Sequence, residues 1–183
     1  MQTESSPRRA TIFTLALICS CVILTSATPA RAQDMRVDRL EIIEFGFFDS
    51  AQVKVTSAKE AEGSVTGMVQ QLGALRMLPE PPANSARIGI GFGVRFRSFG
   101  ERNGERAMLR SVWKIPEPGI VNPTNHTTWR ESAADFPTVI GTSHWRGYGF
   151  DHPWEIVPGT WTLEIWQGDR KLLEKSFEIT KGE

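Results

Sequence analysis

Apolar and polar residues alternate in short runs along most of the chain, and Gly, Pro and Asn separate the runs. A period of two is typical of strands that bury one face, and no segment carries the longer period and the caps of an amphipathic helix. The expected strands span residues 37–48, 51–57, 87–98, 106–115, 126–131, 142–150, 160–167 and 171–180. Many short strands between turn signals predict an all-β fold, an immunoglobulin-like antiparallel β-sandwich.

Two proline-rich segments, 78–85 and 115–123, are expected to be loops because proline has no N–H to give to a central ladder. Residues 68–78 are ambiguous. Their leucines suit a short helix, whereas Gly67 and Gly73 weaken one.

The Asn103-Gly104 pair lies between two expected strands, 87–98 and 106–115. Asn-Gly is the preferred pair for a two-residue type I′ turn, so we predict a hairpin here. The turn fixes a register in which Val94 lies opposite Trp113, and the apolar residues of both strands then share one face.

The other face of this predicted hairpin is basic. Its side chains are Arg87, Arg95, Arg97, Arg106, Arg110 and Lys114. Arg97 would lie opposite Arg110, and like charges in that position repel each other. Acidic residues of a neighbouring strand, such as Glu164 or Glu178, would offset the repulsion in an ordinary surface network. An acidic protein or an envelope polyanion would offset it in a binding site, because arginine favours carboxylate and phosphate contacts. We therefore predict a non-catalytic interaction module whose candidate site is this basic face.

The end of the chain, PGTWTLEIWQGDRKLLEKSFEI, predicts a closing hairpin. A three-residue loop at 168–170 sets Ile165 against Leu173 and Trp161 against Phe177, which keeps the apolar residues on one face. We expect a bulge at this turn.

The first 32 residues have the three parts of a secretory signal: a positive start, an apolar run, and Ala30-Arg31-Ala32, with cleavage expected before Gln33. A membrane-spanning helix and a lipoprotein anchor at Cys21 are the alternatives, and the apolar run is near the lower length limit for a span. We expect a single β-sandwich domain, residues 33–183, that is periplasmic or secreted and has no membrane span.

Cysteine content and charge exclude several functions. Both cysteines, Cys19 and Cys21, leave with the signal, which excludes a thiol nucleophile and a Cys-ligated zinc site. Residues 33–183 carry 18 Lys and Arg against 20 Asp and Glu, a net charge of −2. This balance argues against general nucleic-acid binding, although it permits a local basic face.

Three stretches, EIIEFGFF, IGIGFGVRFR and the closing PGTWTLEIWQGDRKLLEKSFEI, occur in this order between residues 36 and 180. In this combination the chain resembles a bacterial family catalogued as domain of unknown function 3859. The resemblance implies an exported domain of sandwich type. It implies no activity, no catalytic residues and no cofactor.

Six tryptophans offer a second hypothesis, carbohydrate binding, because exposed indole rings can stack on sugar rings. Trp113 and Trp161 fall on predicted core faces. The candidate stacking residues are Trp129, Trp154 and Trp166. More often, a tryptophan of this kind covers the rim of a core.

Three histidines, His126, His144 and His152, offer a third hypothesis, a metal site, although no chelating spacing supports it. Ser143 does not form a nucleophile-base pair with His144, because adjacent strand residues point to opposite faces. We predict no catalytic residue and no cofactor.

Gly89, Gly91 and Gly93 alternate along one expected strand. No capped helix follows them to present amide donors, so they do not predict a nucleotide-binding loop. They predict a strand face that another backbone or side chain approaches closely.

Overall fold

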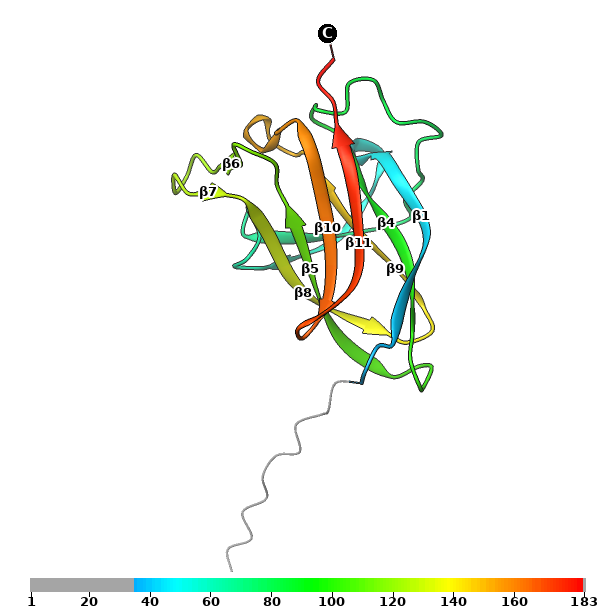
Figure 1. Cartoon of the computed structure of the whole chain (residues 1–183). Coiled ribbons are helices and arrows are strands. Elements are labelled where there is room, and N and C mark those ends of the chain that lie inside the picture. The colour runs from blue at the N-terminus through cyan, green and yellow to red at the C-terminus, as the bar shows by residue number, and fades with distance from the viewer. Residues whose placement is uncertain (1–34, 183) are drawn as a thin grey trace, which may run out of the picture. The chain divides into compact units, whose positions relative to one another are not determined.

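The structure is a computed structural model that describes residues 35–182. The predicted signal peptide, with its alternative anchor Cys21, lies outside the described residues. Two antiparallel sheets pack face to face (Figure 1). The three-stranded sheet has the order β1 (Arg39–Asp49), β4 (Ile90–Phe99), β9 (Ser143–Gly149). The four-stranded sheet has the order β11 (Arg170–Ile179), β10 (Gly159–Gln167), β5 (Arg106–Lys114), β8 (Glu131–Val139). The prediction of an antiparallel β-sandwich is confirmed.

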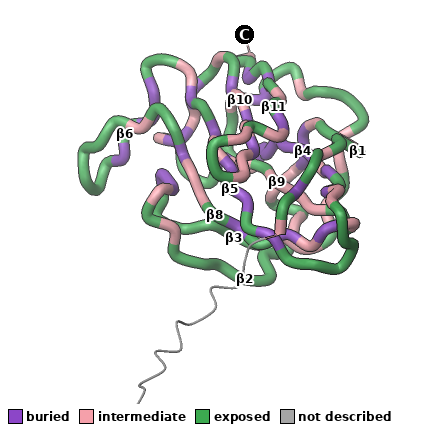
Figure 2. The backbone as a smooth tube through the Cα atoms, turned by 60° about the horizontal axis from the view of Figure 1, so that its bottom comes forward, coloured by how far each residue is buried: buried purple, intermediate pink, exposed green. Residues whose placement is uncertain are grey.

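Two small hairpins and two single turns of 3-10 helix complete the described elements. The hairpins are β2 (Val55–Glu60) with β3 (Met68–Leu72), and β6 (Ile120–Val121) with β7 (Thr128–Trp129). The 3-10 turns are η1 (Ser50–Gln52) and η2 (Pro153–Glu155). Figure 2 shows that the β2–β3 hairpin is mostly exposed, whereas buried positions alternate along the strands of the two sheets.

Aromatic rings from both sheets form the centre of the core. Phe92 of the three-stranded sheet lies 5.3 Å from Trp113, 5.5 Å from Trp161 and 5.4 Å from Phe177, measured between ring centroids. The two tryptophans are buried, as predicted. Strict alternation in β5 and β10 produces this arrangement, because every second side chain points to the opposite sheet.

The closing hairpin has the predicted register. Ile165 pairs with Leu173 and Trp161 pairs with Phe177. The expected bulge is present, between Ile165 and Trp166. The loop is shorter than predicted, because Gln167 already pairs with Arg170 and only two residues remain in the turn.

The glycine-rich strand behaves as predicted. A Cβ atom built on Gly91 would lie 2.1 Å from the Phe48 ring, and one on Gly93 would lie 2.2 Å from the Arg146 carbonyl oxygen. The bare face of β4 therefore admits an aromatic ring and a neighbouring backbone.

The predicted central hairpin is wrong in its pairing. β4 pairs with β1 and β9, and β5 pairs with β10 and β8, so the two strands lie in different sheets. The connection between them is not a type I′ turn, since that turn needs positive φ at both residues and only Gly104 of the Asn103-Gly104 pair has it, at 88°. Gly104 N–H donates to the Ile140 carbonyl over 2.9 Å, which joins this connection to the one between β8 and β9.

The predicted faces are right, although the partners are wrong. Val94 and Trp113 are both buried, and they belong to opposite sheets of one core. Arg97 lies opposite Glu41 and Ser143 rather than opposite Arg110. Hydrophobic alternation specifies which side of a strand is buried, and two strands that face one core from opposite sheets show the same alternation as two strands paired in one sheet.

The other predicted strands match the structure apart from their ends, with four local differences. The strand expected at 51–57 starts with η1, and the ambiguous segment 68–78 starts with the strand β3. The loop expected at 115–123 contains β6. In place of the strand expected at 126–131 the structure has β7 and the much longer β8. The sequence did not predict β8 at its full length because the strand contains alanine, aspartate and proline, which are depleted in strands. Its Pro137 is tolerated because β8 is an edge strand.

Within residues 35–182, no helix is long and apolar enough to cross a membrane.

Candidate functional site

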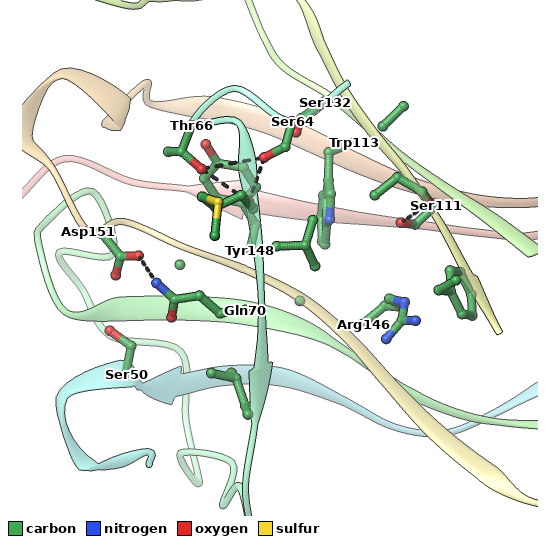
Figure 3. Close-up of a pocket in the computed structure, with 18 of the residues that line it drawn as sticks. Ser50, Ser64, Thr66, Gln70, Ser111, Trp113, Ser132, Arg146, Tyr148 and Asp151 are labelled. Atoms are coloured by element: carbon green, nitrogen blue, oxygen red, sulfur yellow. Dashed lines mark hydrogen bonds between the residues drawn. The ribbon is translucent and has the colours of Figure 1, made fainter. Parts of the chain in front are cut away.

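The sandwich is open along the side where the edge strands β8 and β9 lie. At this opening the β2–β3 hairpin lies across the gap, and a cavity of about 160 Å³ remains between the hairpin and the two edges (Figure 3). We call this cavity the β8–β9 cleft. Trp113, Phe136 and Tyr148 line it from the core side, while Met68 and Gln70 line it from the hairpin.

Small residues along both edges create the space. Ala133 and Ala134 are the β8 contribution next to Phe136. Gly147 and Gly149 give only backbone to the β9 wall. Glycine and alanine remove the side chains that would otherwise close the gap between the sheets.

A few hydrogen bonds hold the hairpin over the cleft. Ala133 N–H donates to the Gly63 carbonyl over 2.7 Å, in the turn that connects β2 to β3. The Asn122 side chain donates to the Val65 carbonyl over 2.9 Å. On the far side, Gln70 Nε2 donates to Asp151 Oδ2 over 3.2 Å, an exposed contact that links the hairpin to the end of β9.

Arg146 is the cation of the cleft, and β9 directs it between the sheets. Its guanidinium carbon lies 3.5 Å from the centre of the Phe136 ring. Nη1 donates to the adjacent Trp145 carbonyl over 2.7 Å. Among the described residues, no carboxylate lies within 4.0 Å of the Arg146 guanidinium. Burial lowers the pKa of Arg146 to about 10, because the charged form has lost water without gaining an anionic partner.

A wider groove of about 720 Å³ adjoins the cleft on the outer side of Arg146, between the β2–β3 hairpin and β8. Arg146, Phe136 and Ala134 line both spaces. The charged residues around the groove have mixed signs. They are Lys59 and Arg110 on the basic side and Glu60, Glu62 and Asp135 on the acidic side.

The inner wall of the cleft is fixed by a buried carboxylate. Glu155 Oε1 accepts from the Tyr148 hydroxyl over 3.1 Å, and its Oε2 accepts from the backbone N–H groups of Asp151 and His152 over 3.0 and 2.8 Å. Burial raises the pKa of Glu155, and burial together with the Glu155 charge raises the pKa of Tyr148. These bonds hold the β9 end and η2 together, so Tyr148 has a fixed position in the wall.

A known protein family matches nearly the whole domain. The family model described as Domain of unknown function (DUF3859) matches residues 37–179. The chain belongs to this family. No curated protein matches the chain in sequence.

Two solved structures are similar to this DUF3859 domain. One is an immunoglobulin-like protein from Pseudomonas aeruginosa, with 24% identity, a TM-score of 0.48, and coverage of 78% of this chain and 97% of that one. The other is a beta-D-glucoside glucohydrolase from Trichoderma reesei, with 8% identity and a TM-score of 0.34, in which 78% of this chain corresponds to 19% of that one.

The basic face predicted for this DUF3859 domain does not exist as one surface. Arg87, Arg95 and Arg97 belong to β4 or the turn before it, whereas Arg106, Arg110 and Lys114 belong to β5 in the other sheet. The two groups point outward from opposite faces of the sandwich, because the buried residues of both strands point inward.

Neighbouring acidic residues neutralise several of these cations. Arg95 lies 3.4 Å from Glu44, and Arg110 lies 3.2 Å from Asp135. Lys114 forms an ion pair with Glu131. The interpretation that acidic neighbours offset these cations is therefore right for Arg95, Arg110 and Lys114. The two acidic residues suggested for that role make other contacts: Glu164 pairs with Lys171, and Glu178 accepts from Thr160.

The three candidate sugar-stacking tryptophans do not form one platform. Trp154 is in η2, just before β10 begins, and Trp166 is near the end of β10. Trp129 and Trp154 are partly buried against the core, and Trp154 stacks on His152 with ring centroids 5.3 Å apart. The Trp166 indole N–H donates to Glu164 over 3.1 Å.

The histidines are likewise separate. His126 lies between β6 and β7, His144 lies on β9, and His152 precedes η2. Among residues 35–182, no three His, Cys, Asp or Glu side chains come close enough together to hold a metal ion.

Sequence reasoning missed Arg146, although the sequence contains a signal for it. In the strand predicted at 142–150, a period of two places Arg146 on the same face as Tyr148 and opposite to Trp145 and Gly147. An arginine on the aromatic face of a strand beside two glycines indicates a charge directed inward. What the sequence did not show is that β9 is an edge strand, which is the condition for a cleft there.

Proposed function

We propose that this DUF3859 domain is an exported, non-catalytic binding module whose ligand enters the β8–β9 cleft. The observation that carries the proposal is the Arg146 side chain, directed into a cavity between the sheets without an acidic partner among the described residues. An isolated charge removed from water is costly, and proteins keep such groups mostly where they serve binding or catalysis.

The architecture around Arg146 favours binding over catalysis. The acidic groups nearest the cleft are engaged: Asp135 pairs with Arg110, Asp151 accepts from Gln70, and Glu155 accepts three hydrogen bonds. A general base acts from a fixed position within reach of the substrate. Glu155 is fixed in the wall but uses both oxygens in hydrogen bonds within the protein, whereas Asp135 and Asp151 lie at the exposed edge.

The cleft replaces the basic sheet face as the candidate site. That face depended on a hairpin that the strand pairing excludes. An acidic ligand remains part of the proposal, because a guanidinium in a cavity forms charge-assisted hydrogen bonds with an anionic group. Export is supported by the signal features of residues 1–32, and we propose a periplasmic or secreted location.

The test is to purify the mature chain from the envelope of its native host, denature it, and identify the released small molecules by mass spectrometry. Ala134→Leu partly fills the cleft, and Ala51→Leu in η1 is the matched control outside it. We expect one released compound from the wild type and from the control, and its loss from Ala134→Leu. Equal release from all three proteins, or release of nothing from the wild type, would contradict the proposal.

A further inference from the structure

Arg146 has donors left over after its contacts within the protein. A guanidinium has five N–H donors, and one of them is used, from Nη1 to the Trp145 carbonyl. The Phe136 ring covers one face of the guanidinium and supplies no acceptor in its plane. The edge of the guanidinium is therefore free to bind an oxygen pair, the geometry that a carboxylate matches with two parallel hydrogen bonds.

The cavity beside Arg146 is small and largely aromatic on its core side. Its volume of about 160 Å³ is close to that of an engineered apolar cavity of about 150 Å³ that binds benzene. Trp113, Tyr148 and Phe136 provide the ring surfaces. A ligand body of roughly one ring or a short branched chain fits this space.

The charges around the cleft argue against a highly charged ligand. Asp135 and Asp151 lie at its edge, and Glu60 and Glu62 lie along the adjoining groove. Lys59 and Arg110 lie there too, but Arg110 is paired with Asp135, so the carboxylates still outnumber the cations and a phosphate dianion or a polyanion would meet net negative charge. A single negative charge on an apolar body meets Arg146 without that cost.

We infer that Arg146 binds the carboxylate of a small apolar monocarboxylate whose body lies against Trp113 and Phe136 in the β8–β9 cleft. This inference rests on the proposed function, since it names the ligand class of the same site. The carboxylate restores to Arg146 the ionic partner that the described residues do not supply.

Benzoate is the probe that tests the inference, with benzamide as its uncharged analogue and inorganic phosphate as a second anion. Titrate each into the ¹⁵N-labelled mature chain and follow the Arg146 Nε–H and Trp113 indole N–H resonances. We expect saturable shifts of both resonances with benzoate, about tenfold weaker binding of benzamide, and no saturable shift with phosphate.

Variants separate the carboxylate contact from general affinity for aromatic rings. Arg146→Gln is expected to weaken benzoate binding about tenfold or more while leaving benzamide binding unchanged. Arg97→Gln, on the outer face of the same three-stranded sheet, is the matched control and is expected to bind both compounds like the wild type. If Arg146→Gln does not fold, the titrations of the wild type with benzoate, benzamide and phosphate still show whether the site requires a carboxylate.

The inference is overturned if benzoate shifts neither resonance, if benzamide binds as tightly as benzoate, or if phosphate competes with benzoate. The native protein could release a compound that Ala134→Leu does not retain, while benzoate shifts neither resonance. This result would overturn only the ligand class and would support the cleft as the binding site. Benzoate binding at Arg146 with nothing released from native protein would support the ligand class and overturn the proposed cellular role.

Discussion

The guanidinium carbon of Arg146 lies 3.5 Å from the centre of the Phe136 ring, and the two residues belong to different sheets. The contact therefore joins the edge strands β9 and β8, which have no backbone ladder between them because they belong to separate sheets. A cation over an aromatic face is stabilised by the ring quadrupole, and more strongly when both groups have lost water.

Phe136→Leu is expected to destabilise the domain by about 2 kcal/mol, because it removes ring packing and the cation–π contact together. Phe45→Leu is the matched control, since the Phe45 ring also carries a cation, Lys175 Nζ at 3.6 Å, but is 53% exposed. The control is expected to lose less than about 1 kcal/mol. Urea unfolding measures both, and equal losses would contradict the role given to the buried contact.

Gly91→Ala is expected to destabilise the domain by about 2 kcal/mol, because the new Cβ would lie 2.1 Å from the Phe48 ring and that ring is fully buried. Gly149→Ala on the neighbouring strand is the control, with its closest contact at 3.9 Å. Thermal unfolding compares them. A Gly91 variant as stable as the control would show that β4 and Phe48 do not pack as described.

Asn122→Ala is expected to lower the free energy of unfolding by about 1–3 kcal/mol, because it leaves the Val65 carbonyl unpaired in the turn between β2 and β3. Hydrogen exchange should accelerate in residues 61–72 more than in the two sheets. Asn125→Ala is the control. It removes an exposed hydrogen bond that Thr127 N–H donates to the Asn125 side chain, and it is expected to change the stability and the hydrogen exchange only slightly. Uniform acceleration across the domain would contradict a hairpin anchored locally by Asn122.

His144 makes stability depend on pH. Burial lowers the pKa of His144, and its Nε2 accepts a hydrogen bond from Val139 N–H over 3.2 Å, so the folded state favours the neutral ring. A group whose pKa is lowered on folding binds more protons in the unfolded state, and its contribution is lost as the pH falls below the unfolded value of about 6.5.

Stability should therefore fall between about pH 7 and pH 5 in the wild type and fall less in His144→Asn. His126→Asn, at an exposed position with a φ of 54° that asparagine tolerates, is the control and should keep the wild-type dependence. Urea midpoints measured across this range check the prediction. Parallel curves for the wild type and His144→Asn would contradict it.

Arg97 and Arg110 lie on opposite faces of the sandwich, so their contributions to retention on an anionic matrix should be independent. We expect Arg97→Glu and Arg110→Glu each to lower the eluting salt concentration slightly, and the double variant to lower it by the sum of the two. A double variant that loses far more than the sum would indicate one shared cationic surface after all.

Local patterns in the sequence predicted the strands and their buried faces, whereas strand partners came from long-range packing. The register of Ile165 with Leu173 was predictable because a short turn and the alternation fix it together. The pairing of β4 with β1 was not, because the Asn103-Gly104 signal favoured a hairpin and no local feature indicated the crossing to the other sheet. Arg146 could be placed on an inward face from its parity, but its lack of an acidic partner follows only from the positions of β8 and the β2–β3 hairpin.

The most direct test of the binding account is the Arg146 Nε–H resonance in protein purified from its native host, recorded before and after unfolding, dialysis and refolding. We predict that the resonance moves on refolding and exchanges faster with water, because the cleft has lost its anionic occupant. A resonance that is identical in the two samples, with the same exchange rate, would contradict a ligand bound at Arg146.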